Sequence, residues 1–193
     1  QVTAVPGSSQ PSAVARPGRV CACALAARCA RSACLRATAS LALAAALLLA
    51  ARLSGWRGLA SLDQPILWVL HLGYGWLAVG FALKAAADLA GWLPPSAALH
   101  ALTAGAAGTM ILRVMTRAAL GHTGRALATP PAIVVAYGLI SVGAALRVAE
   151  PLLAAPSAMI LTASALIWAA GFAIFTVVYW PILTRPRIDG RPG

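Results

Sequence analysis

The stretch from Ser157 to Trp180 reads SAMILTASALIWAAGFAIFTVVYW and is almost wholly apolar. It is long enough to cross the hydrocarbon core of a bilayer, which takes about 20 residues in a helix. Pro156 precedes it, and the sequence Tyr179-Trp180-Pro181 closes it with an aromatic anchor and a break. Aromatic residues of this kind are typical of a membrane interface. The stretch is therefore predicted to be a transmembrane helix.

Four further apolar runs lie upstream and pass the same length test. The second of them ends in Lys84 and Asp88, an i,i+4 pair that can form at a membrane boundary. The chain is predicted to be all-α, a polytopic bundle of about five transmembrane helices occupying residues 37–186, followed by a short tail of residues 187–193. The predicted spans lie near residues 37–53, 64–87, 95–120, 131–148 and 157–180.

Composition supports a membrane protein. Of the 193 residues, 61% are hydrophobic and only 10% are charged, whereas soluble domains are roughly one quarter charged. The 15 Lys and Arg outnumber the 4 Asp and Glu, giving a net charge of +11. Such a balance suggests nucleic acid in a soluble protein, but these cations lie between long apolar runs. A lipid bilayer is therefore the predicted partner, and nucleic acid is not.

The cations also predict an orientation. With residues 1–36 set aside, one set of connections and the C-terminus carry eight Arg, whereas the opposite side carries only Lys84 and Arg147. Positive residues favour the cytoplasmic side, so the C-terminus is predicted to be cytoplasmic and the loop near Gly91 external. The eight are Arg52, Arg57, Arg113, Arg117, Arg125, Arg185, Arg187 and Arg191.

Residues 1–36 do not fit this scheme. They are rich in Pro, Ser, Ala, Cys and Arg, and their five Arg would lie on the external side. The spacing of their four cysteines matches neither a paired zinc framework nor covalent haem attachment. The segment is therefore expected to be disordered and foreign to the rest, as after a shifted reading frame or in a truncated gene.

The three histidines all lie in or against apolar runs: His71, His100 and His122. Ionisable residues at membrane depth are costly and point to function, although a single histidine can merely hydrogen-bond a neighbouring helix. Three in such positions favour ligands. His100 and His122 are separated by roughly 33 Å if the chain between them is helical, so they cannot share one metal. His71 enters its span from the side of His122, and these two are the predicted pair.

The neighbours of His71 leave room beside its imidazole. Gly73 and Gly75 flank Tyr74, which makes space for a planar ligand or a closely packed helix. The thioether of Met110 could bind copper or a haem iron, although most methionines in membrane helices are core. The third span also carries a stripe of small residues, for which helix packing is favoured over a cofactor slot: Ala101, Ala104, Gly105 and Gly108.

Cations surround the end of the third span. Arg113 and Arg117 lie one turn apart, and the sequence Gly121-His122-Thr123-Gly124-Arg125 follows. Exposed N–H groups and cations in such a turn suit a carboxylate, for example a haem propionate. The competing interpretation is an ordinary cytoplasmic loop.

These motifs resemble a known family. The stretch from His100 to Arg125 closely resembles the signature of the NnrS family, and Leu70-His71-x-Gly73-Tyr74-x-Trp76 resembles its LHxGYxW element. The resemblance implies a bacterial inner-membrane protein that binds haem and copper and belongs to the cellular response to nitric oxide.

The resemblance also implies roles for single residues. His71, His100 and His122, with Met110, are candidate metal or haem ligands. Arg117, Arg125 and Tyr74 are candidate cofactor-binding groups, the two arginines holding a propionate or anchoring the loop. Family members are much longer, so the chain resembles their C-terminal portion and would lack N-terminal helices as partners. Arg113 stands where a small residue is expected, and so places a cation inside the bundle or is a local variant.

Three functions remain open at this stage. The leading one is a haem- and copper-binding membrane protein that lowers nitric oxide stress. The alternatives are a small-solute transporter or channel, whose buried His and Arg would line the pathway, and a membrane assembly component without chemistry of its own. Whether nitric oxide would be turned over, bound or only protected against stays open.

Overall fold

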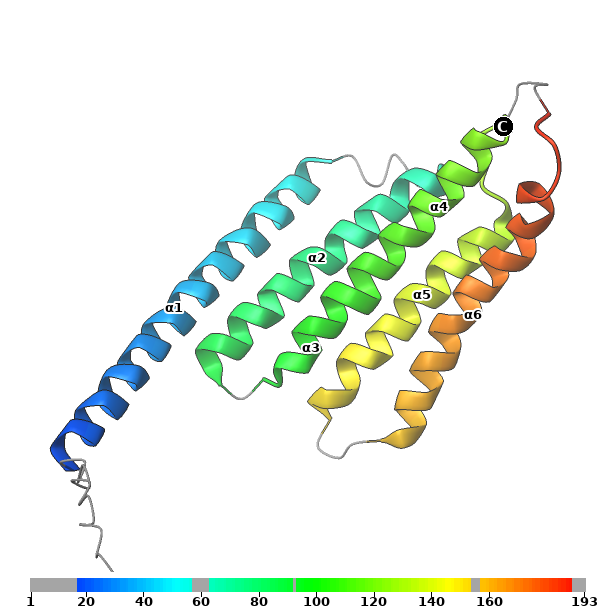
Figure 1. The fold of residues 1–193 in the computed structure, drawn as a ribbon. Coiled ribbons are helices and arrows are strands. Elements are labelled where there is room, and N and C mark those ends of the chain that lie inside the picture. Colours follow the sequence, from blue (N-terminus) through cyan, green and yellow to red (C-terminus); the bar gives the residue numbers. More distant parts are fainter. Residues whose placement is uncertain (1–16, 57–62, 92, 154–156, 189–193) are drawn as a thin grey trace, which may run out of the picture. The chain divides into compact units, whose positions relative to one another are not determined.

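The computed structural model describes residues 17–56, 63–91, 93–153 and 157–188, and within them every regular element is a helix (Figure 1). This confirms the predicted all-α fold. The elements are α1 (Pro17–Gly55), α2 (Pro65–Ala90), α3 (Pro95–His100), the π-helix η2 (Ala101–Ala107), α4 (Gly108–His122), α5 (Pro131–Ala149), the short 3-10 turn η3 (Glu150–Leu152) and α6 (Ala158–Leu183).

Five helical segments in this part of the chain are long and apolar enough to cross a membrane, as predicted. They run over residues 32–55, 65–90, 95–122, 131–152 and 158–183, within a few residues of the predicted spans. The boundaries follow from local chemistry: Pro65, Pro95 and Pro131 occupy first turns of helices, where the missing N–H costs no hydrogen bond. Gly91 ends α2 at φ 71, a left-handed conformation that glycine adopts without strain.

The chain divides into two compact units, Gln1–Leu35 and Arg36–Gly193. Residues 17–36, which belong to the segment predicted to be disordered or poorly packed, are helical; residues 1–16 lie outside the described residues. The reason is composition, because Ala, Arg and Leu are strong helix formers and no proline occurs between Pro17 and Pro65.

Within the second unit, α1 and α2 meet at a polar contact. Lys84 Nζ donates to Asp88 Oδ2 at 2.6 Å, confirming the predicted i,i+4 pair. Thr38 Oγ1 of α1 donates to the same carboxylate oxygen at 3.2 Å. The carboxylate of Asp88 is thereby satisfied at the end of the second span.

The core lies where α4, α5 and α6 pack together. Tyr137, Tyr179, Leu112, Ile133 and Ile140 are all fully buried there. Glycines let α5 and α6 approach closely: a Cβ on Gly143 would lie 2.9 Å from Ser164 O, and one on Gly171 would lie 3.0 Å from Ala136 O. The outward faces carry exposed large hydrophobic side chains such as Val177 and Leu166. In water this surface would be costly; in a bilayer it faces lipid, as expected of a multi-pass membrane protein.

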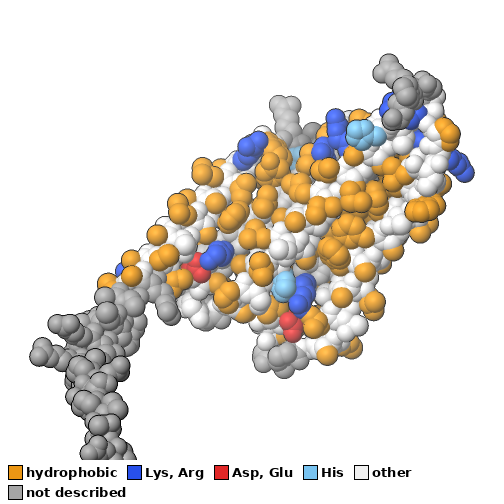
Figure 2. Space-filling view, in the orientation of Figure 1, with side chains coloured by type: hydrophobic (Ala, Val, Ile, Leu, Met, Phe, Trp, Pro, Cys, Tyr) orange, Lys and Arg blue, Asp and Glu red, His pale blue; other side chains and the backbone are white. Residues whose placement is uncertain are grey.

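The ends of the spans carry most of the charge. Figure 2 shows hydrophobic side chains over the middle of the visible face and Lys and Arg side chains toward its ends. We expect a reporter that is active only in the periplasm to be inactive when fused after Gly193 and active when fused after Gly91, because Arg is concentrated on the C-terminal side. The reverse pattern of activity would show that the predicted orientation is wrong.

Candidate functional site

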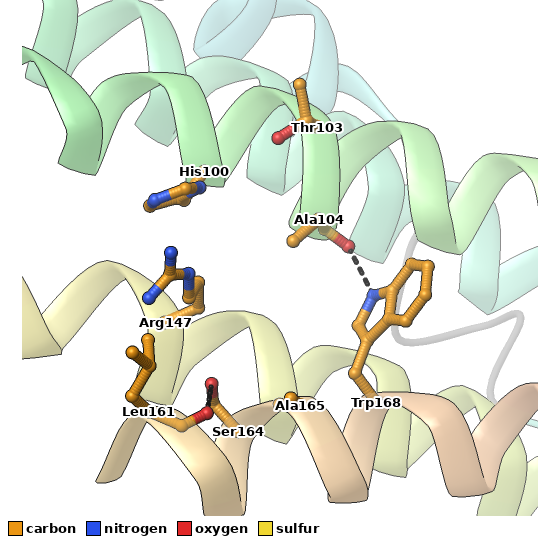
Figure 3. Close-up of a pocket in the computed structure, with 9 residues that line it drawn as sticks. His100, Thr103, Ala104, Arg147, Leu161, Ser164, Ala165 and Trp168 are labelled. Atoms are coloured by element: carbon orange, nitrogen blue, oxygen red, sulfur yellow. Dashed lines mark hydrogen bonds between the residues drawn. The ribbon is translucent and has the colours of Figure 1, made fainter. Parts of the chain in front are cut away.

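A cavity of about 540 Å³ lies between α3 and η2 on one side and α5 and α6 on the other (Figure 3). Its apolar walls come from α5 and α6, and its charged and imidazole groups come from the ends of α3 and α5. The residues used below are His100, Thr103, Ala104, Arg147, Leu161, Ser164, Ala165 and Trp168.

His100 and Arg147 form the polar wall of the cavity. Figure 3 shows the imidazole of His100 and the guanidinium of Arg147 pointing toward one another from opposite sides. Neither group has a hydrogen-bonding or ion-pair partner among the described residues. The charges of Arg147 and Glu150 both interact electrostatically with the imidazole at longer range. A cation without a paired carboxylate attracts negatively charged groups. The cavity therefore combines one free imidazole with one free cation.

The hydroxyl groups of the cavity are already engaged. Thr103 Oγ1 donates to Leu99 O and Ser164 Oγ donates to Leu161 O, each at 2.8 Å. Their protons are directed to their own helices and not into the cavity. His100 and Arg147 are consequently the side chains best placed to bind a guest.

A π-helical turn shapes one wall of the cavity. The third span leaves the α-helical register at η2 and regains it at Gly108; such turns are rare and often occur at functional sites. Trp168 Nε1 donates to Ala104 O of this turn at 3.1 Å (Figure 3). A Cβ on Gly105 would lie 2.5 Å from the ring of Trp76. The small residues of this stripe thus leave room for the rings of Trp76 and Trp168, in agreement with the interpretation that the stripe serves helix packing.

His71 lies in a different place, near the start of α2. Its Nδ1 is 3.2 Å from Leu67 O, and its Nε2 is buried without a partner among the described residues. The ring of Trp56 lies edge-on to the imidazole of His71, with ring centroids 5.1 Å apart. The same Trp56 ring lies edge-on to the ring of Tyr74, with centroids 4.8 Å apart. Arg52 lies over the Trp56 and Tyr74 rings at 5.5 and 5.8 Å. If Nδ1 donates to the carbonyl, Nε2 carries the lone pair that a metal requires.

The groups at the end of α4 are largely exposed. His122 and Arg117 are exposed, and His122 lines a second, smaller cavity of about 250 Å³ beside Met115 and Phe175. Arg125 Nη1 donates to Ile182 O at 3.3 Å. Arg125 therefore anchors the loop after α4 to α6, which is one of the two roles considered for it.

The structure does not bring His71 and His122 together. A Cβ on Gly73 would meet the side chain of Met110 at 2.7 Å, so Met110 packs against α2 and His71 lies near the level of Leu112. Ten residues, or roughly 15 Å of helix, then separate the levels of His71 and His122. No group of three His, Cys, Asp or Glu side chains within the described ranges could hold a metal ion.

Sequence reasoning missed Arg147, Trp168 and Ser164 as parts of a site. In the sequence, Arg147 is predicted only to be a loop cation, and Trp168 lies within an apolar run. The available signal is Arg147 itself, one of only two cations that residues 37–193 place on the predicted external side. Its proximity to His100 depends on how α3 and α5 pack, which no local pattern reveals.

Comparison with known proteins gives one match. A family model described as NnrS protein matches residues 3–187 of the chain. No curated protein and no solved structure matches.

Proposed function

This chain belongs to the NnrS family, and we propose that it is a haem-binding protein of the bacterial inner membrane that acts in the response to nitric oxide. The observation that carries this proposal is the cavity of about 540 Å³ in which a free imidazole and a free guanidinium face one another. His100, the first residue of the family-like signature, supplies the imidazole.

The side chains of the cavity fit the chemistry of haem. Haem requires a nitrogen ligand for its iron, apolar surfaces for its ring and cations for its propionates. His100 offers the nitrogen, Arg147 the cation, and Leu161, Ala165 and Trp168 the apolar surfaces. We assign the iron to His100 and a propionate to Arg147.

The residues of the chain also suit a neutral diatomic ligand. Haem supplies an iron that coordinates small diatomic molecules such as nitric oxide. Nitric oxide dissolves in lipid and needs no polar pathway through the bundle. Leu161, Ala165 and Trp168 of α6 give the cavity an apolar wall, which favours a neutral ligand over a hydrated one.

Copper binding stays a prediction. His71 offers one buried nitrogen without a partner, and Met110 offers one thioether that packs against α2. Single donors of this kind need further ligands to hold copper. The proposal therefore rests on haem.

The test is a haem titration of the full chain in detergent. We expect a saturable Soret band at one haem per chain. Arg147→Gln should weaken haem binding about tenfold, the usual cost of one charge-assisted hydrogen bond. Arg117→Gln removes an exposed cation and is the matched control, expected to bind haem normally.

Two results would contradict the proposal. Absence of a saturable band would favour transport or assembly as the function. Equal weakening by both arginine variants would show that net charge, and not the cavity, governs binding.

A further inference from the structure

The backbone of the third span changes its hydrogen-bonding register within η2. Where η2 begins, the N–H of Ala101 donates to the carbonyl four residues earlier, which is the α-helical pattern. Where η2 ends, the N–H of Gly108 donates to Thr103 O, five residues earlier, and to Gly105 O. The carbonyl of Ala104, with which Gly108 would pair in an α-helix, is passed over. A carbonyl inside a bilayer needs a donor from the protein.

The indole of Trp168 supplies such a donor from another helix, α6. Its Nε1 donates to Ala104 O at 3.1 Å (Figure 3). The ring can reach this carbonyl because Gly108 has no side chain: a Cβ there would lie 3.1 Å from Trp168 Nε1. Phe172, one turn further along α6, packs against the ring, with centroids 4.6 Å apart. The indole therefore removes a cost of the π turn, and so favours it over a uniform α-helix.

A second tryptophan contacts the same turn but does not bond to its backbone. Trp76 of α2 packs on Gly105, where a Cβ would lie 2.5 Å from the ring. The only N–H of its side chain donates to Ser141 Oγ of α5 at 3.3 Å. Trp76 therefore supports the turn by packing alone, and the hydrogen bond that distinguishes the two registers comes from Trp168.

The register of this turn decides where His100 points. A π turn accommodates about one residue more than the α-helix it interrupts, and each residue of an α-helix adds a rotation of about 100°. If the same residues were wound as a uniform α-helix, the part before η2 would rotate by about this angle relative to α4. His100 directly precedes η2, so its imidazole would turn away from Arg147 and out of the cavity.

We propose that Trp168 is a positioning residue for His100. By donating to Ala104 O, its indole N–H holds the π turn and thereby keeps the imidazole facing Arg147. Trp168 acts through the backbone of η2 and does not ligate the iron. The consequence for haem rests on the proposed function, whereas the orientation of His100 does not.

The first measurement needs no haem. It uses the full chain in detergent, with His100→Cys, Arg147→Cys and the four native cysteines replaced by Ser, and a short bis-maleimide that joins the two new thiols. Trp168→Phe keeps an apolar ring without the N–H, and should slow this cross-linking about tenfold, the usual effect of one hydrogen bond. Trp180→Phe removes an exposed indole of the same helix and is the matched control, expected to cross-link at the starting rate. The native cysteines are Cys21, Cys23, Cys29 and Cys34.

Deletion of Ala106 separates register from packing. Combined with Trp168→Phe, it removes the additional residue of the π turn, so position 100 should face the cavity again and the rate of cross-linking should recover. A mere packing defect at Trp168 would not be repaired by a deletion in another helix. If Trp168→Phe alone does not fold, the double variant carries the test, because its third span no longer needs the hydrogen bond.

Haem titration of the same Trp168→Phe and deletion variants, with His100 and Arg147 intact, tests the consequence for haem. Trp168→Phe should weaken haem binding about tenfold, and the deletion should restore it. The proposal is overturned if Trp168→Phe cross-links at the starting rate, or if the double variant neither folds nor cross-links. The expected cross-linking pattern without a Soret band in any variant would support the positioning role and contradict only the proposed haem function.

Discussion

Replacing His100 by Ala is expected to abolish the Soret band of the haem-loaded protein. The cavity offers one imidazole, and without it the iron has no nitrogen ligand there. The helices should persist, because the imidazole of His100 makes no hydrogen bond within the described residues and helix α3 continues directly into η2. Absorbance after haem loading, with circular dichroism on the same sample, measures both effects. His100→Gly should regain a band when free imidazole is added, which a purely structural defect would not allow.

The other two histidines are the controls. His122→Ala changes an exposed side chain at the end of α4, and His71→Ala changes an imidazole that contacts Trp56. Both variants should keep the band. Loss of the band in both, with its retention in His100→Ala, would restore the prediction that His71 and His122 hold the cofactor and would show that the cavity does not.

The second large effect is expected at the contact of α5 and α6. Gly143→Ala should lower the free energy of unfolding by about 2–3 kcal/mol, as overpacking does in a tight core. Its Cβ would lie 2.9 Å from Ser164 O and Trp168 N, and these backbone atoms move only if α6 moves. Since Gly143 also lines the cavity, haem affinity should fall with stability. Thermal unfolding in detergent, followed by circular dichroism, is the measurement.

Gly138 of the same helix is the matched control. A Cβ at this position would meet nothing within 4 Å. Gly138→Ala should therefore leave stability unchanged or raise it by up to about 1 kcal/mol, because Ala favours a helix more than Gly does. Equal unfolding temperatures for the two variants would show that α5 and α6 are not held by this close approach.

The membrane spans could be predicted because their signals are local. Apolar length defines each span, and residues such as Pro131 and Gly91 mark boundaries through their own backbone chemistry. The helix over residues 17–36 is not predicted, because the overall composition of this segment differs from that of the apolar spans. Helix propensity depends instead on each single residue, and the many Ala, Arg and Leu residues of the segment favour a helix.

The candidate site was less accessible from the sequence. The sequence identifies His100 as a candidate ligand but does not pair it with Arg147, because a shared membrane side does not fix the level at which a side chain lies. The link between His100 and Arg147 needs the packing of α5 against the third span. The bond from Trp168 to Ala104 likewise needs α6 in place, and the π turn that it contacts has no sequence pattern of its own.

That π turn lets the third span tolerate a change of length at one place and not at others. An α-helix turns about 100° per residue, and a π turn accommodates about one residue more than the α-helix it interrupts. Deleting Ala106 would therefore let residues 95–122 wind as a uniform α-helix while His100 kept its rotation relative to Arg113. A deletion within α4, for example of Ile111, has no extra residue to remove and would turn His100 by about 100° relative to Arg113. Among related sequences, an alignment gap at η2 is therefore compatible with retention of the histidine, whereas a gap between Gly108 and Arg113 should coincide with its loss.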